Sequence, residues 1–146
     1  MLRFKLFYAR NQGAWSTFQA GAGGAIYRGA GGSGGAMKQY VIDQIRPRDY
    51  EKLKAYLDRT LGESGVSGLY WMPMDAALLT DGQQAHRECA PFYMALELEP
   101  DRLVGELLVR TRRRVRCDCI HYADQRQRNW LIQAVDAIFE VLGIIT

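Results

Sequence analysis

The stretch from Pro91 to Tyr122 constrains the fold more than any other part of this chain. At its start, apolar side chains alternate with Tyr, Ala and Glu, and strict alternation is typical of a strand that is buried on one face. The same kind of alternation returns twice after short turns. The pattern therefore predicts three consecutive antiparallel strands, over residues 92–99, 103–110 and 115–122.

Helical patterns flank these strands and carry clear start and stop signals. One helix is expected from Pro47 to the residues before Gly62, and the last helix ends at Gly143. Two capping-box pairs mark further helix starts, Thr80 with Gln83 and Asp124 with Gln127. Additional strands are expected at 40–45 and 67–72, and a short helix at 81–88. The order β-α-β-α-β-β-β-α predicts an α+β fold with a mainly antiparallel sheet and helices packed on one face.

Residues 1–36 differ in composition from the rest of the chain, since they hold 9 of the 15 glycines. Such a segment buries too little apolar surface to offset the entropy of ordering, so we expect a flexible Gly/Ala-rich leader and a single domain over 37–146. We favour a translation start at Met37, because the codons for Gly34 and Gly35 can spell a bacterial ribosome-binding sequence. A targeting peptide, a tag with a Gly-Ser linker and a native functional arm are the alternatives.

Charge and cysteine content narrow the classes of function. Four of the 19 basic residues and none of the 16 acidic ones precede Met37, so residues 37–146 carry a net charge of −1. The domain thus lacks the overall positive charge that attracts nucleic acid. No run of residues is apolar enough to predict a membrane span. Three cysteines without a secretory signal favour reduced thiols and a cytoplasmic location.

All three cysteines and both histidines fall into two short groups, which makes them candidate metal ligands. The candidates are His86, Cys89, Cys117, Cys119 and His121. Positions i and i+3 of a helix share a face, and alternate positions of a strand do too, so each group can point one way. Thiolates and imidazoles are the ligands of tetrahedral zinc sites, so zinc is the cofactor that this pattern allows.

We nevertheless favour plain core packing and no cofactor, because cysteine often behaves as a small buried hydrophobe. Cys117 and Cys119 are expected as reduced, unliganded thiols on the inner face of the third strand, under the last helix. A disulfide between them is disfavoured, since their Cα atoms would lie roughly 6.6 Å apart on a strand whose parallel side chains hold the Cβ atoms apart. A cysteine nucleophile with His121 as its base is a further alternative.

Five arginines crowd the second turn of the predicted strands: Arg110, Arg112, Arg113, Arg114 and Arg116. Arginine makes bidentate contacts with phosphate, so these residues are candidates for phosphate or RNA binding. We favour a solvated sheet face, because four acidic residues share it with four of the arginines: Glu97, Glu99, Glu106 and Asp118. No aromatic residue stands between the arginines to stack on bases, which also argues against nucleic acid.

Residues 69–74 are apolar on both faces of their predicted strand, which favours a central strand. The alternative is an interface for a protein partner or a second copy, with Tyr70 and Trp71 as anchors. No carboxylate pair or nucleotide loop can be assigned. The sequence therefore favours a non-catalytic binding or assembly domain in a bacterial cytoplasm. The alternatives are a small metal- or thiol-dependent enzyme and an RNA- or phosphate-binding protein.

Overall fold

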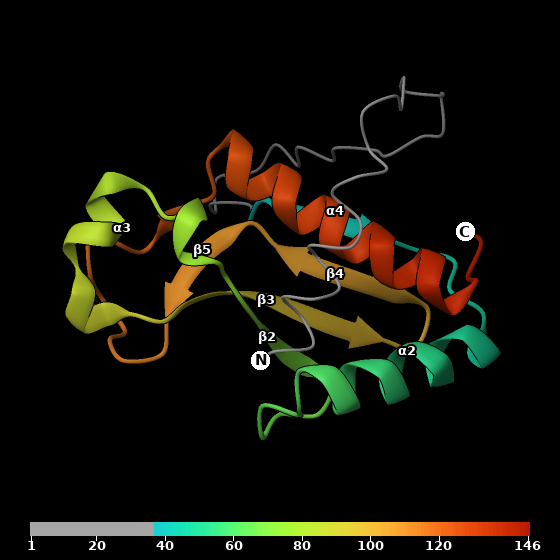
Figure 1. Cartoon of the computed structure of the whole chain (residues 1–146). Helices are drawn as coiled ribbons and strands as arrows, with labels where there is room; N and C mark the ends of the chain where they lie inside the picture. Colours follow the sequence, from blue (N-terminus) through green and yellow to red (C-terminus); the bar gives the residue numbers. More distant parts are fainter. Residues whose placement is uncertain (1–36) are drawn as a thin grey trace.

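Strand β3 is the centre of a six-stranded antiparallel sheet in the computed structural model, which describes residues 37–146 (Figure 1). The strands are β1 (Gln39–Ile42), β2 (Leu69–Pro73), β3 (Phe92–Glu99), β4 (Arg102–Glu106), β5 (Leu108–Thr111) and β6 (His121–Tyr122). β2 pairs with one edge of β3, while β4 and β5 share the other edge. β1 and β6 then pair with β4 and β5 respectively. The predicted leader, residues 1–36, lies outside the described residues.

Among residues 37–146, three helices accompany the sheet, and two of them cover the same face (Figure 1). They are α2 (Pro47–Thr60), α3 (Asp81–Ala85) and α4 (Gln125–Leu142), with 3₁₀ turns η2 (Ala76–Leu78) and η3 (Arg87–Cys89) on either side of α3. The Tyr70 hydroxyl of β2 donates to Asp58 of α2 at 2.6 Å, and the Tyr40 hydroxyl of β1 donates to Asp136 of α4 at 2.7 Å. The predicted α+β class with a mainly antiparallel sheet is therefore confirmed. None of the described helices is long and apolar enough to cross a membrane.

The core lies between the sheet and these two helices. Leu53 and Leu57 of α2, Leu131 of α4 and Leu96 of β3 are all inaccessible to solvent. Each such side chain contributes about 1.5–3 kcal/mol through burial. A methyl group at Gly105 would lie 3.1 Å from Leu131 Cδ2, so this glycine lets α4 approach the sheet closely. The apolar sides of the two helices thus face the sheet, in agreement with the predicted packing of helices on one face.

The predicted helix starts and the last helix end are confirmed residue by residue. Both capping boxes form, with the Thr80 and Asp124 side chains accepting from the backbone N–H groups of Gln83 and Gln127. Gly143 ends α4 with a φ of 63°, a left-handed conformation that favours glycine. These signals act over three or four residues, which is why the sequence alone reveals them.

The second predicted strand, residues 103–110, is interrupted at Leu107. Its N–H donates to the Lys38 carbonyl at 2.9 Å, and its carbonyl accepts from the Ala123 N–H at 2.9 Å. Both backbone groups of Leu107 thus bond outside the ladder with β3. The strand therefore divides into β4 and β5, as at a bulge.

The third predicted strand, residues 115–122, is wrong for all but its last two residues. Only His121 and Tyr122 pair with β5. The preceding residues form bends and a turn, closed by the Ile120 N–H donating to the Cys117 carbonyl at 3.0 Å. Val115, which a core strand would bury, is 95% exposed. The alternation of polar and apolar residues here belongs to a loop whose cysteines converge, not to a strand.

The prediction that residues 69–74 form a central strand is also wrong. Within residues 37–146, β2 pairs with β3 alone and is the edge of the sheet. Tyr70 is fully buried against the helices, so it is no anchor for a partner. Trp71 points to the opposite face, which α2 and α4 leave uncovered, and remains partly exposed.

Candidate metal centre

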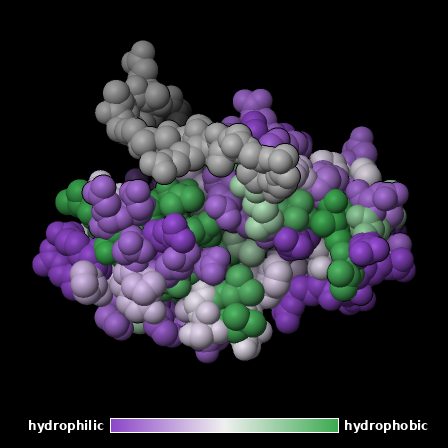
Figure 2. Space-filling model, turned by 180° about the vertical axis from the view of Figure 1, so that it is seen from behind, coloured by the Kyte–Doolittle hydropathy of each residue, from purple (hydrophilic) through white to green (hydrophobic). Residues whose placement is uncertain are grey.

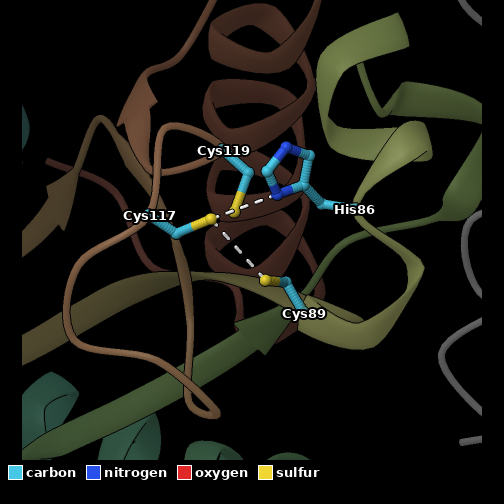
Figure 3. A group of neighbouring side chains, drawn as sticks. All are labelled: His86, Cys89, Cys117 and Cys119. Atoms are coloured by element: carbon cyan, nitrogen blue, oxygen red, sulfur yellow. Dashed lines mark hydrogen bonds between the residues drawn. The ribbon is translucent and has the colours of Figure 1, made fainter.

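Four of the five predicted ligands meet in space, as Figure 3 shows. We call this group of His86, Cys89, Cys117 and Cys119 the Cys₃His cluster. One ligand atom from each side chain lies within 4.8 Å of all the others. The Cys117 sulfur is 3.1 Å from His86 Nδ1 and 3.8 Å from the Cys89 sulfur. Four soft donor atoms gathered in so small a volume can hold a metal ion.

The first pair of ligands comes from the junction of two short helices. The sequence predicted one helix over 81–88, but α3 ends at Ala85 and η3 follows. His86 lies at the break, with φ −91° and ψ 61°, and its carbonyl accepts from the Cys89 N–H at 3.0 Å. The tight turn of η3 keeps the i and i+3 side chains on one side. His86 and Cys89 thus point together, as predicted, although the element differs.

The second pair of ligands comes from the turn that replaces the predicted third strand. Cys117 and Cys119 are separated by the exposed Asp118 at its tip. A turn of this kind folds two thiols around one point, as structural zinc sites do, whereas a straight strand does not. The turn therefore brings the thiols of Cys117 and Cys119 close enough to serve one metal ion together.

The two buried thiols and the half-exposed one differ in acidity. Cys89 and Cys119 are 0% and 2% exposed, while Cys117 and His86 are partly open to solvent. Burial raises the pKa of Cys89. Burial, together with the hydrogen bonds that its thiol donates to Cys117 and Cys89, raises the pKa of Cys119 to about 12. The backbone N–H and then the thiol of Cys119 lower the pKa of Cys117 to about 7. A bound cation would favour the thiolate form of all three.

A buried glutamine pair supports the ligands from behind. The Gln127 amide donates to the Gln83 side-chain oxygen at 2.9 Å, and the Gln83 amide donates to the Cys119 carbonyl at 3.4 Å. Both glutamines are fully buried. The Thr111 hydroxyl likewise donates to the Cys89 carbonyl. These contacts fix the backbone at two ligands, the role that outer-shell groups play at metal sites.

Sequence reasoning found these glutamines only as helix-capping residues. The signal for each is its place three residues after a cap, which says nothing about a partner far along the chain. Gln83 and Gln127 are 44 residues apart, and Gln83 and Cys119 are 36 apart. Only the packing of α3 against the start of α4 brings them together.

The fifth predicted ligand, His121, lies outside the Cys₃His cluster. It sits on β6 opposite Val109, and its Nδ1 is 2.9 Å from the Tyr122 carbonyl oxygen. The histidine beside Cys117 is His86. The hypothesis of a cysteine nucleophile with His121 as its base therefore has no geometric support.

The sequence predicted that the arginines pair with acidic residues on the outer face of the sheet. Of the five arginines, Arg110 alone does so. Its guanidinium makes two bonds to Glu106, at 2.9 and 2.7 Å. Glu99 pairs instead with Arg102. Within residues 37–146, no carboxylate lies within ion-pair distance of the other four arginines, Arg112, Arg113, Arg114 and Arg116. The reason is that the chain leaves the sheet after Thr111, so these side chains have no strand opposite them.

Similarity to known proteins adds nothing to this assignment. Comparisons of the chain with protein-family models, with curated proteins and with solved structures find no match. The geometry of the Cys₃His cluster is therefore the basis for assigning a function.

Proposed function

We propose that this chain is a zinc-binding protein whose Cys₃His cluster holds one structural zinc ion. The observation that carries the proposal is the convergence of four donor atoms within 4.8 Å, supplied by two separate segments. Zn–S bonds of about 2.3 Å arranged tetrahedrally place two sulfurs about 3.8 Å apart. The Cys89 and Cys117 sulfurs are separated by 3.8 Å.

The chemistry of the donors favours zinc and a structural role. Three thiolates and an imidazole suit zinc, whereas calcium and magnesium select oxygen ligands. Protein side chains fill all four positions of a tetrahedron, so no position stays open for water or substrate. The site therefore supports a non-catalytic binding or assembly domain with a bound metal. A reducing bacterial cytoplasm is our proposed location, because the thiols must be reduced to bind.

The role of the ion would be to close a loop that the sheet leaves unsupported. Cys89 and Cys117 lie 28 residues apart, and the ion would join η3 to the loop of residues 112–120. That loop forms no strand and most of its side chains are exposed. Metal binding would contribute directly to the stability of this end of the molecule.

Metal analysis of purified protein tests the proposal. The full chain, purified under reducing conditions, should contain near one zinc ion per chain by inductively coupled plasma mass spectrometry. Cys89→Ser and Cys119→Ser should lose it, whereas His121→Ala should keep it, because His121 lies outside the cluster. The His121 variant is the matched control for removing a nearby candidate ligand.

A second measurement covers the case in which the cysteine variants fail to fold. Wild-type protein reconstituted with cobalt should show the charge-transfer absorption of tetrahedral thiolate–cobalt bonds. Reduced wild-type protein that takes up neither metal would overturn the proposal. A metal-free protein that readily forms a disulfide between Cys89 and Cys117 would also overturn it, in favour of a redox role.

A further inference from the structure

We infer that the segment 112–116, together with the outer face of β2 and β3, binds single-stranded nucleic acid. We call this segment the arginine loop. Its four arginines are exposed, and none is paired with a carboxylate in the part of the chain that the structure describes. Unpaired guanidinium groups are ready to contact phosphate without first breaking an ion pair. None of these residues belongs to the proposed zinc site.

Two adjoining grooves give this surface a shape. One, of about 410 Å³, lies between the arginine loop and β2, and it is lined by Leu69, Trp71 and the loop residues. The other, of about 340 Å³, is lined by Trp71, Tyr93 and Pro73 with residues at and just after the end of α2. Trp71 and Arg112 border both grooves. One tryptophan and one arginine are thus shared by the two grooves.

In the sequence, no aromatic residue stands between the arginines, but the fold brings aromatic side chains close to them. Trp71 of β2 and Tyr93 of β3 supply them, with ring centroids 6.3 Å apart and planes inclined at 67°. Both lie on the sheet face opposite α2 and α4. Aromatic rings beside arginines form the usual platform for single strands, because every base has a face that can stack.

The charges around the grooves favour a polyanion. Among the described residues that line either groove, Glu63 alone is acidic. Seen from behind, the molecule has strongly hydrophilic residues next to small hydrophobic groups (Figure 2). The two grooves are therefore locally basic, although residues 37–146 as a whole carry a net charge of −1. Stacking on Trp71 requires an unpaired base, which favours a single strand over a duplex.

A binding assay on the full chain tests this inference. Fluorescence polarisation with a labelled oligouridylate of about ten nucleotides should show binding that weakens steeply as salt is raised. The double variant Arg112→Ala/Arg113→Ala should weaken binding roughly tenfold or more, with the zinc content and thermal midpoint unchanged. Arg48→Ala is the matched control, because Arg48 is an exposed arginine on α2, outside the grooves.

Two further arms test the stacking component. Trp71→Ala should weaken binding by a similar factor, while Trp71→Phe, which keeps a ring, should retain more of the affinity. A duplex of the same length and free uridine monophosphate should both bind more weakly than the single strand. Equal binding of the duplex, full competition by the mononucleotide, or no salt-dependent binding would each overturn the inference.

The outcome is separable from that of the zinc proposal. Oligonucleotide binding by protein that holds no metal would leave this inference standing and contradict the zinc proposal alone. Folded protein that holds zinc but does not bind the oligonucleotide would support the zinc proposal and contradict this inference alone.

Discussion

The body of the sheet and the loop end of the molecule are held together in different ways. Around β3, continuous ladders on both edges and fully buried side chains from α2 and α4 hold the structure. The loop of residues 112–120 forms no ladder, and it meets the body through a few hydrogen bonds, the Cys₃His cluster and the packing of Cys119 and Ile120 against the core. Apolar burial therefore stabilises the body, whereas the loop end would depend on the proposed zinc ion for much of its stability.

The largest effect that separates the two regions should come from removing zinc. A strong chelator should lower the free energy of unfolding by several kcal/mol, on the order of 5, because the ion binds the folded loop and not the unfolded chain. Hydrogen exchange should then speed up in residues 112–120 while β3 stays protected. Equal loss of protection in both regions would show that the loop and the body unfold as one unit.

The converse experiment creates a cavity in the body. Leu57→Ala, at a fully buried position of α2, should cost about 2–5 kcal/mol of stability in urea unfolding. The zinc content of the folded protein should stay near one per chain, since Leu57 belongs to α2 and the cluster to η3 and the loop. A Leu57→Ala protein that folds but holds no zinc would contradict the separation of the two regions.

The glutamine pair links the regions, and its removal should have an intermediate effect. Gln83→Ala removes the partner of the Cys119 carbonyl and one of the two bonds that the Gln127 amide donates, the other being to the Leu78 carbonyl. Leaving buried polar groups unpaired in this way costs about 1–3 kcal/mol. It should also weaken zinc affinity by roughly 10- to 100-fold, measured by competition with a chelator. The control is Gln84→Ala, whose side chain makes an exposed bond to the Leu79 carbonyl. A change in stability without a change in zinc affinity would show that the pair serves packing alone.

The smallest effect concerns an acidic residue of the body. Lys54 and Tyr70 donate hydrogen bonds to Asp58 and hold the pKa of its carboxyl below the usual value. A lowered folded-state pKa stabilises the protein above the unfolded value of about 3.9, and this contribution disappears as pH falls through the folded value. Asp58→Asn should therefore be slightly less stable than wild type at neutral pH, and the difference should shrink in acid.

Urea unfolding of both proteins between neutral and acid pH measures this difference, with the exposed Asp43→Asn as control. Loss of zinc in acid affects both proteins alike, so it cancels in the comparison. If the difference in free energy of unfolding between Asp58→Asn and wild type grows as pH falls, the carboxylate of Asp58 does not stabilise the folded protein as expected.

Local signals in the sequence were sufficient for the body of the fold. Alternation over residues 92–99 identified β3, and Gln83, Gln127 and Gly143 marked two helix starts and a helix end. Each of these signals depends on residues at most a few positions apart, whose backbone geometry is set by their own side chains. The α+β class follows from the order of such elements.

The candidate sites depend on contacts that no local pattern encodes. Cys117 and Cys119 alternate with polar residues as on a strand, yet they lie in a turn that brings them next to Cys89 and His86. Trp71 lies beside the arginine loop only because β2 pairs with the edge of β3 that β4 and β5 leave free. The candidate residues could be identified from their chemistry. Which of them lie together depends on the packing of segments tens of residues apart. Such contacts form only when burial of the whole core offsets the entropy of closing the intervening loops.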